Sequence, residues 1–296
     1  MIKSEEDLSG RNILITGATH GLGLELTYSL LQSGANIAIC ARSKIEIEKL
    51  IQNLNLRKNR VQLIIGFQAN VTKVDEVNKM YSETLSKLGQ IDTLINNAGI
   101  VGPIGKFLDV SPQEWLNNID TNFLGSVNMI RKFLPDMLKN KFGRVIQLSG
   151  GGASNPLFGM SAYAASKSAI VRFVENLSIE YHDSGVFFNS VAPGMLKTRL
   201  LHEMLEAGPE KIGEVLYEKS IEKSESIQDS SQKAIKLIKF LISNSSIGVN
   251  GKLISAEWDD WQNWSSQIDK LINSDTYTLR RITKLERSKT WDTLHD

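Results

Sequence analysis

The chain alternates short β-branched runs with longer amphipathic stretches, and this alternation is the strongest limit on its fold. A helical pattern or a loop separates each run from the next, as expected for a parallel sheet covered by helices on both faces. Seven strands in one sheet predict an α/β fold in a single domain. The strands are expected near residues 11–16, 35–40, 61–67, 91–96, 143–149, 185–191 and 251–255.

Composition and charge narrow the class of protein. Among 296 residues, 34 are Lys or Arg and 33 are Asp or Glu, so the net charge of +1 gives no reason to expect nucleic acid or an anionic membrane. No run approaches the roughly 20 apolar residues of a membrane span, and the N-terminus lacks the apolar stretch of a signal peptide. Cys40 is the only cysteine, which excludes an internal disulfide and a cysteine-built metal site. We therefore expect a cytoplasmic protein without a metal.

A glycine-rich segment follows the first expected strand. Residues 16–23 read TGATHGLG and lead into a helical stretch. Gly17 permits a tight turn, Gly21 lets the backbone approach a pyrophosphate, and Gly23 allows the helix to pack closely on the strand. Because strand, spacing and helix agree, the segment predicts a dinucleotide site with the phosphates at the helix N-terminus.

The end of the second strand indicates which dinucleotide is bound. An acid about 20 residues after the glycines would hydrogen-bond the ribose 2′-hydroxyl of NAD, but Ala41 and Arg42 stand there instead. A guanidinium pairs with a 2′-phosphate, so NADP(H) is favoured over NAD(H). The alternative is a solvated arginine at a strand end. His20 is either a further phosphate contact or an exposed loop residue.

Four further motifs follow the glycine loop in order. They are NNAG at 96–99, NFLG at 122–125, YAASK at 163–167 and PGMLKT at 193–198. With them the chain resembles the short-chain dehydrogenase/reductase family over about residues 9–258. The resemblance implies a Rossmann-type doubly wound sheet in a catalytic domain of residues 1–258, with a helical substrate lid at about 196–220 and a C-terminal extension over 259–296. It also implies an NAD(P)-dependent oxidoreductase that transfers hydride between a nicotinamide cofactor and a ketone or secondary alcohol.

Tyr163 and Lys167 lie one helical turn apart, so their side chains share a face. Lowering the pKa of a tyrosine from about 10 to near 7 takes roughly 4 kcal/mol, which an ammonium about 4 Å away supplies at an effective dielectric of about 20. The resemblance implies that Tyr163 is the general acid and base of the reaction. Asn122 lies on the apolar stripe of an expected helix over about 112–139, and the resemblance implies that it helps hold a water linked to Lys167. A capping or packing asparagine is the alternative.

The resemblance further implies a set of cofactor contacts. The NNAG segment supports the adenosine side, Thr198 contacts the carboxamide or the phosphates, and Asn70 stands where an aspartate near the adenine amino group is common. The amide oxygen of Asn70 still accepts a hydrogen bond. The expected cofactor-binding residues are Gly17, Thr19, His20, Gly21, Leu22, Gly23, Arg42, Asn70, Val71, Asn97, Ala98, Gly99, Tyr163, Lys167, Pro193, Gly194 and Thr198.

The chain departs from the family at the catalytic serine. The family places this serine thirteen residues before the tyrosine, where the chain has Gly150. Ser149 is one residue earlier, and the alternation of side chains along a strand turns it to the opposite face. A bulge or a left-handed turn in the glycine run 150–152 would re-aim it, and on that basis Ser149 is the expected catalytic serine. Ser154, Asn155 or a water are the alternatives.

The substrate, the oligomer and the extension are less constrained. The lid mixes leucines with His202, Glu203 and Glu206, so a partly apolar ligand is expected. The alternative activity is that of a 3-oxoacyl-carrier-protein reductase, and the alternative from another class is a cofactor-binding sensor or scaffold with little turnover. The resemblance implies subunit contacts through the helix from Tyr163 to Tyr181, where small residues allow close approach, so a homodimer or homotetramer is expected. Trp258, Trp261 and Trp264 predict an aromatic face that packs on the core or on a subunit, with carbohydrate stacking as the alternative.

Overall fold

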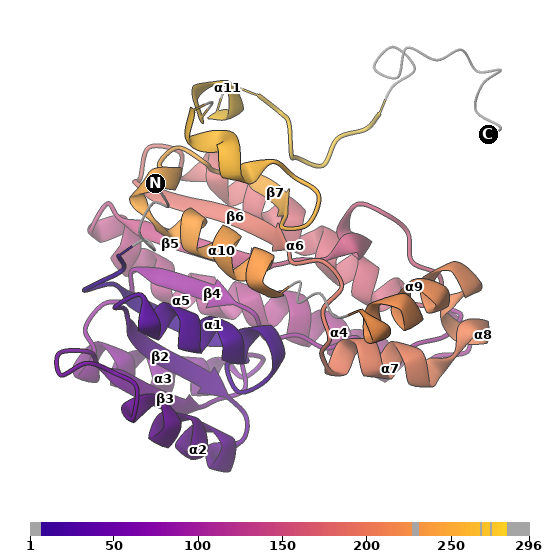
Figure 1. Cartoon of the computed structure of the whole chain (residues 1–296), viewed down its shortest axis with the longest axis horizontal. Coiled ribbons are helices and arrows are strands. Elements are labelled where there is room, and N and C mark those ends of the chain that lie inside the picture. The colour runs from indigo at the N-terminus through magenta and orange to yellow at the C-terminus, as the bar shows by residue number, and fades with distance from the viewer. Residues whose placement is uncertain (1–6, 227–230, 267, 273, 283–296) are drawn as a thin grey trace.

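The computed structural model describes residues 7–226, 231–266, 268–272 and 274–282, and in them seven parallel strands form one sheet (Figure 1). The strand order is β3-β2-β1-β4-β5-β6-β7, which confirms the predicted α/β class and strand number. The order switches direction between β1 and β4, the place where open α/β sheets bind ligands. The strands are β1 (Asn12–Thr16), β2 (Asn36–Ala41), β3 (Ile64–Gln68), β4 (Thr93–Asn96), β5 (Gly143–Leu148), β6 (Val186–Ala192) and β7 (Lys252–Ser255).

Helices cover both faces of the sheet, and none in the part that the structure describes is long and apolar enough to cross a membrane. One face carries α1 (Gly21–Gln32), α2 (Lys44–Asn55) and α10 (Ser231–Ile242). The other carries α3 (Val74–Lys87), α5 (Gly125–Lys139) and α6 (Ser161–Glu180). The remaining helical elements are α4 (Pro112–Ile119), the π-helical turn η1 (Asp120–Leu124), η2 (Gly151–Ala153), α7 (Arg199–Ala207), α8 (Pro209–Ile212), α9 (Glu214–Glu225), η3 (Asn244–Ser246), η4 (Trp261–Ser266) and α11 (Ile268–Ile272).

The central strands are buried on both faces, which explains their nearly continuous apolar sequences. Along β1, Ile13 and Ile15 pack against α1 and α10, whereas Leu14 packs in the cluster that contains α5. Cys40 belongs to the second cluster, and burial raises the pKa of its thiol to about 12. The cysteine is therefore an inert core residue.

The C-terminal extension returns along the edge strand β7. The Leu253 N–H donates to the Tyr277 carbonyl oxygen at 2.7 Å, and Lys252 Nζ donates to the Ser274 carbonyl oxygen at 2.6 Å. Trp264 packs on the Tyr277 ring with centroids 4.8 Å apart. The extension therefore covers a sheet edge that would otherwise be open to pairing.

The three tryptophans near the start of the extension do not form the single aromatic face that their spacing predicts. Trp261 and Trp264 are buried in the core cluster beside α10, but Trp258 is 86% exposed. Trp261 lies in the η4 turn beside Phe240, with ring centroids 6.2 Å apart. Trp261 and Trp264 therefore pack on the chain's own core, whereas Trp258 does not.

Candidate active site

The glycine-rich segment forms the turn from β1 into α1, at the carboxyl end of the sheet (Figure 1). Gly17 and Gly21 have φ angles of 64° and 50°, a left-handed conformation that favours glycine. A Cβ atom on Gly23 would collide with the Gly17 carbonyl oxygen. His20 stands at the N-cap of α1 without a capping hydrogen bond from its side chain, so the first N–H groups of the helix lack a side-chain partner there. This loop fits the pyrophosphate of a dinucleotide.

The NNAG segment supports the glycine loop through hydrogen bonds. Asn97 Nδ2 donates to the carbonyl oxygens of Thr16 at 3.0 Å and of Gly17 at 3.1 Å. In return, Thr16 Oγ1 accepts from the backbone N–H groups of Asn97 and Ala98, each at 3.0 Å. The hydrogen bonds thereby join the ends of β1 and β4 beneath the glycine loop.

Thr198 lies against the same loop, although it follows β6 in the sequence. A Cβ atom on Gly21 would lie 3.0 Å from Thr198 Cγ2. Thr198 is the N-cap of α7, and the chain reaches it through Pro193 and Gly194, which has a φ of 86°. The structure thus brings the PGMLKT segment and the glycine loop together.

Asn70 and Val71 follow β3 and are engaged with their neighbours. Asn70 Oδ1 accepts from the backbone N–H and from the hydroxyl of Thr72, both at 3.1 Å. The oxygen expected to accept from adenine therefore already holds two hydrogen bonds. Val71 is buried, and its carbonyl oxygen accepts from Asn128 Nδ2 at 3.0 Å.

Arg42 follows β2 with an exposed side chain, and its guanidinium has no hydrogen bond or ion pair with any residue in the described ranges. A nearby acid, Glu46 on α2, instead contacts the glycine loop. Its Oε1 lies 3.3 Å from His20 Nε2, and its Oε2 accepts from Thr19 Oγ1 at 3.3 Å. Sequence reasoning missed Glu46, although its spacing of four residues from Arg42 placed it in the first turn of the next helix.

Tyr163 and Lys167 project from the first two turns of α6. Lys167 is buried, its Nζ donates to the Leu148 carbonyl oxygen at 2.7 Å, and the same atom lies 5.5 Å from the centroid of the Tyr163 ring. The lysine is thus held between the end of β5 and the phenol ring.

Burial dominates the protonation of this pair. It raises the pKa of Tyr163 to about 12 and lowers the pKa of Lys167 to about 8. The sequence predicted a tyrosine pKa lowered by the lysine, but Nζ lies over the ring and is anchored to Leu148, so desolvation decides both values. Tyr163 therefore keeps its proton at neutral pH and is available as a proton donor.

Asn122 lies in the π-helical turn between α4 and α5, a local widening that is frequent at functional sites. Its Oδ1 accepts from the Ile100 N–H at 2.8 Å, and its Nδ2 donates to the Ile100 carbonyl oxygen at 2.9 Å. Nδ2 also lies 3.0 Å from Ser166 Oγ and 3.1 Å from Asn118 Oδ1. Both the oxygen and the nitrogen of the buried Asn122 amide therefore have hydrogen-bond partners.

Gly99 stands between the asparagine and the lysine. A Cβ atom on Gly99 would lie 3.2 Å from Asn122 Oδ1 and 3.7 Å from Lys167 Nζ. The glycine thus leaves room where the two polar groups face each other. Sequence reasoning missed Asn118 and Ser166, although each is one helical turn from an expected site residue, Asn122 and Tyr163 respectively.

The glycine run after β5 does not re-aim Ser149. Gly150 has φ 176° and ψ 174°, which is extended backbone, and neither Gly151 nor Gly152 has a positive φ. Ser149 Oγ is buried and has no hydrogen-bond partner among the residues that the structure describes, and a Cβ atom on Gly150 would lie 2.8 Å from the Tyr163 hydroxyl oxygen. The residue that faces the phenol is therefore Gly150, and a catalytic role for Ser149 remains a prediction without a contact to support it.

The helices α7, α8 and α9 occupy the region in which the sequence predicts a lid, and their apolar side chains pack beside Tyr163. Met204 and Ile212 of the lid join Val101 and Met160 in one buried cluster, against which the phenol ring is packed. His202 is 72% exposed and lies 3.3 Å from Glu206, so it faces solvent. The lid therefore presents an apolar surface to the site.

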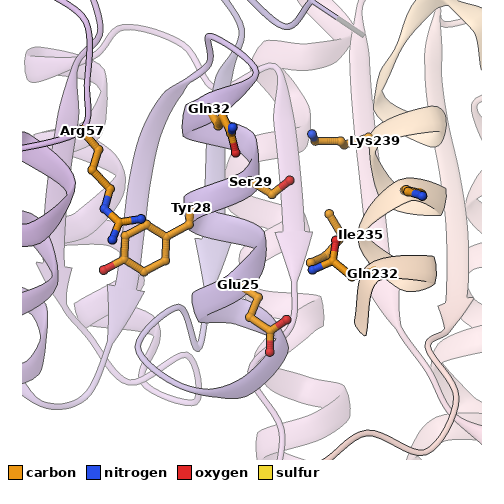
Figure 2. Close-up of a pocket in the computed structure, with 9 residues that line it drawn as sticks. Glu25, Tyr28, Ser29, Gln32, Arg57, Gln232, Ile235 and Lys239 are labelled. Atoms are coloured by element: carbon orange, nitrogen blue, oxygen red, sulfur yellow. The ribbon is translucent and has the colours of Figure 1, made fainter. Parts of the chain in front are cut away.

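A separate pocket of about 330 Å³ lies between α1 and α10 (Figure 2). Its lining is mostly polar and includes Glu25, Tyr28, Arg57 and Lys236. None of the residues that line it belongs to the Tyr163 group or to the glycine loop. Within the described ranges, no three His, Cys, Asp or Glu side chains are grouped so as to hold a metal ion.

Comparisons with known proteins identify the family of the chain. The model of the short chain dehydrogenase family matches residues 11–208. The chain is 34% identical to the 3-oxoacyl-(acyl-carrier-protein) reductase FabG of Staphylococcus epidermidis over 189 residues, which are 63% of this chain and 75% of the relative. It is also 34% identical to the oxidoreductase UcpA of Salmonella typhimurium over 215 residues, which are 71% of this chain and 79% of the relative.

Solved structures share the fold. A short-chain type dehydrogenase/reductase from Mycobacterium ulcerans matches with a TM-score of 0.75 at 22% identity, over 90% of this chain and 97% of that one. A mutant actinorhodin polyketide ketoreductase with NADPH matches with a TM-score of 0.74 at 24% identity, over 83% and 95%. A 3-oxoacyl-(acyl-carrier protein) reductase with bound NAD from Brucella melitensis matches with a TM-score of 0.69 at 24% identity, over 84% and 90%.

The family model spans about two thirds of the chain, and the matched region contains the glycine loop, Asn122, Tyr163 and Lys167. The curated relatives carry the names of oxidoreductases. The chain therefore belongs to the short-chain dehydrogenase/reductase family and is an NAD(P)-dependent oxidoreductase.

Proposed function

We propose that the protein is a carbonyl reductase or alcohol dehydrogenase that favours NADP(H) and acts on a ketone or a secondary alcohol. The observation that carries this proposal is the partly buried Tyr163 beside the buried Lys167, with the glycine loop and an apolar lid around the same end of the sheet. A sensor or scaffold with little turnover would have no need for a buried lysine next to a protonated phenol.

Each residue of the site has a role in this proposal. A bound nicotinamide supplies or accepts the hydride. Tyr163 donates its phenolic proton to the carbonyl oxygen in reduction and accepts the alcohol proton in oxidation. Lys167, when charged, stabilises the tyrosinate, and Asn122 holds the Ile100 backbone and fixes the polar surroundings of the lysine. The cofactor would rest on the residues at the carboxyl ends of the strands, namely Gly17, Thr19, His20, Gly21, Leu22, Gly23, Arg42, Asn70, Val71, Asn97, Ala98, Gly99, Pro193, Gly194 and Thr198.

The NADP(H) preference rests on Arg42. Its guanidinium is exposed at the end of β2, where no carboxylate of the strand repels a 2′-phosphate. The substitution Arg42→Ala tests this point, because it should weaken NADPH binding about tenfold or more and leave NADH binding within about twofold. An equal loss for both cofactors would contradict the preference.

A second candidate activity is the reduction of 3-oxoacyl thioesters. The likeness to the FabG reductase of Staphylococcus epidermidis favours it, and the apolar lid cluster is compatible with an acyl chain. An acyl substrate and a compact ketone differ in chain length, so the dependence of kcat/KM on acyl length separates the two candidates.

The experiment that tests the proposal is NADPH oxidation against a panel of ketones, aldehydes and acyl thioesters, with Tyr163→Phe as the paired variant. Removal of the phenolic proton should lower kcat by about 10²- to 10⁴-fold and leave the Kd of NADPH unchanged. Turnover that is the same in both proteins would refute the role of Tyr163. Tight NADPH binding with no turnover on any substrate would favour the sensor.

We further propose a homodimer or homotetramer in the cytoplasm. The single cysteine is buried in the core, as suits a reducing compartment, and the exposed part of α6 carries small residues such as Ala165 that permit close helix packing. A solution mass of 33.0 kDa by light scattering at micromolar concentration would identify a monomer and contradict the oligomer.

A further inference from the structure

Glu46 places a carboxylate beside the glycine loop, in a region where the sequence predicted no acidic residue. Thr19 Oγ1 donates to Glu46 Oε2 at 3.3 Å, and His20 Nε2 lies 3.3 Å from Glu46 Oε1. The Glu46 side chain is 42% exposed, so it lines the surface of the site and is not part of the core. Two loop side chains therefore hold one acid at a defined place.

The Glu46 carboxylate lies near the end of β2, the part of such a sheet that distinguishes NAD(H) from NADP(H). The N–H groups of Gly17 and Ala18 donate to the Cys40 carbonyl oxygen at 2.8 and 3.4 Å, so the loop and the end of β2 are joined. In a sheet of this type the ribose 2′ position lies by the end of the second strand. Glu46 lies four residues after Arg42, in the first turn of α2, and contacts the loop through Thr19 and His20.

We propose that Glu46 is the residue that limits the selectivity for a 2′-phosphate, so that the chain accepts NAD(H) as well as NADP(H). A carboxylate accepts a hydrogen bond from a 2′-hydroxyl but repels a 2′-phosphate. Glu46 therefore opposes Arg42, the residue on which the proposed NADP(H) preference rests. Its neighbours Thr19 and His20 hold the carboxylate at the loop, and Glu46 forms no ion pair with Arg42.

The test compares two fragments that differ only in the 2′-phosphate, adenosine 2′,5′-bisphosphate and adenosine 5′-monophosphate. Calorimetric titration of the full chain measures both dissociation constants without catalysis. In Glu46→Gln the bisphosphate should bind about tenfold more tightly, the size expected for one unit charge about 6 Å away at an effective dielectric of about 40. Binding of the monophosphate should stay the same or weaken by about threefold.

Glu48→Gln is the matched control. Glu48 lies on the same helix, is 59% exposed and pairs with Lys44 at 3.8 Å. Both variants remove one negative charge, so a change in net charge alone would affect them equally. The proposal expects the ratio of the two dissociation constants to change in Glu46→Gln only.

Two outcomes would overturn the proposal. The first is an unchanged ratio of the two dissociation constants in Glu46→Gln, whether neither fragment or both fragments change equally. The second is a change of the same size in Glu48→Gln. The variant Arg42→Ala separates this test from the proposed NADP(H) preference. If the ratio is the same in Arg42→Ala as in the natural chain, the preference fails, whereas the role of Glu46 is judged on Glu46→Gln alone.

Discussion

Gly150 borders the Tyr163 hydroxyl so closely that a Cβ atom on the glycine would lie 2.8 Å from the phenol oxygen. The backbone of Gly150 is extended, a conformation that any residue adopts, so the close approach and not the backbone excludes a side chain here. The hydroxyl of Tyr163 thus borders the space that a side chain at position 150 would take.

The substitution Gly150→Ala tests this packing. The added methyl group must displace the phenol, so kcat should fall by about tenfold or more, and the free energy of unfolding should fall by about 1 to 3 kcal/mol. Gly151→Ala is the matched control, because a Cβ atom there meets no atom within 4 Å. Equal activity in the two variants, measured with the best ketone of the panel, would contradict this geometry.

The substitution Ser149→Ala removes a buried hydroxyl that has no hydrogen-bond partner in the described part of the chain. Because nothing is left unpaired, we expect kcat within about twofold of the natural chain and an unfolding free energy within about 1 kcal/mol. Ser166→Ala is the contrasting variant, since Ser166 Oγ donates to the Tyr163 carbonyl oxygen at 2.7 Å and accepts from Asn122. A loss of 10² or more in the kcat of Ser149→Ala would instead make Ser149 the catalytic serine.

The buried Lys167 should lower the free energy of unfolding, although activity requires it. Burial lowers its pKa to about 8 from 10.5, so at neutral pH the folded state holds a costly charge, and the free energy of unfolding rises as the pH goes from about 8 to 10.5. The difference between these two pKa values corresponds to about 3 kcal/mol of lost unfolding free energy at neutral pH. The hydrogen bond from Lys167 Nζ to the Leu148 carbonyl oxygen offsets about 1 kcal/mol of this loss. Lys167→Met should therefore be about 2 kcal/mol more stable at pH 7 and nearly inactive. Urea unfolding of both proteins from pH 6 to 10 measures the effect, and a variant less stable at pH 7 would contradict it.

The fold was more predictable than the site. Strand positions followed from the apolar runs, because buried parallel strands need continuous apolar sequence, and the glycine loop followed from its spacing. The protonation of Tyr163 and the direction of Ser149 did not follow, since both depend on tertiary distances: Lys167 Nζ is anchored to Leu148, and the glycine run stays extended at Gly150. The contact of Glu46 with the loop likewise joins two segments that no local pattern connects.

Asn122 should contribute to both stability and activity. Asn122→Ala leaves the Ile100 N–H without its side-chain partner and removes one of two side-chain donors to the Ile100 carbonyl oxygen, the other being Asn118 Nδ2 at 3.2 Å. This loss should cost about 2 to 3 kcal/mol of unfolding free energy. Asn117→Ala on the same helical segment is the control, because its side chain is exposed and bonds only Gln113 among the described residues. Chemical denaturation should separate the two variants, and equal stability would refute the anchoring role of Asn122.

Trp264 should hold the C-terminal extension on the sheet edge. It is buried against Tyr277, whose carbonyl oxygen accepts from Leu253 of β7, so Trp264→Ala opens a cavity and should lower the free energy of unfolding by about 3 to 5 kcal/mol. Trp258→Ala removes the same side chain from a site that is 86% exposed, and its cost should stay below about 0.5 kcal/mol. Hydrogen exchange gives a local readout, because the Leu253 amide should lose protection in Trp264→Ala alone. If both variants melt alike and protect Leu253 alike, the extension does not depend on Trp264 for its hold on β7.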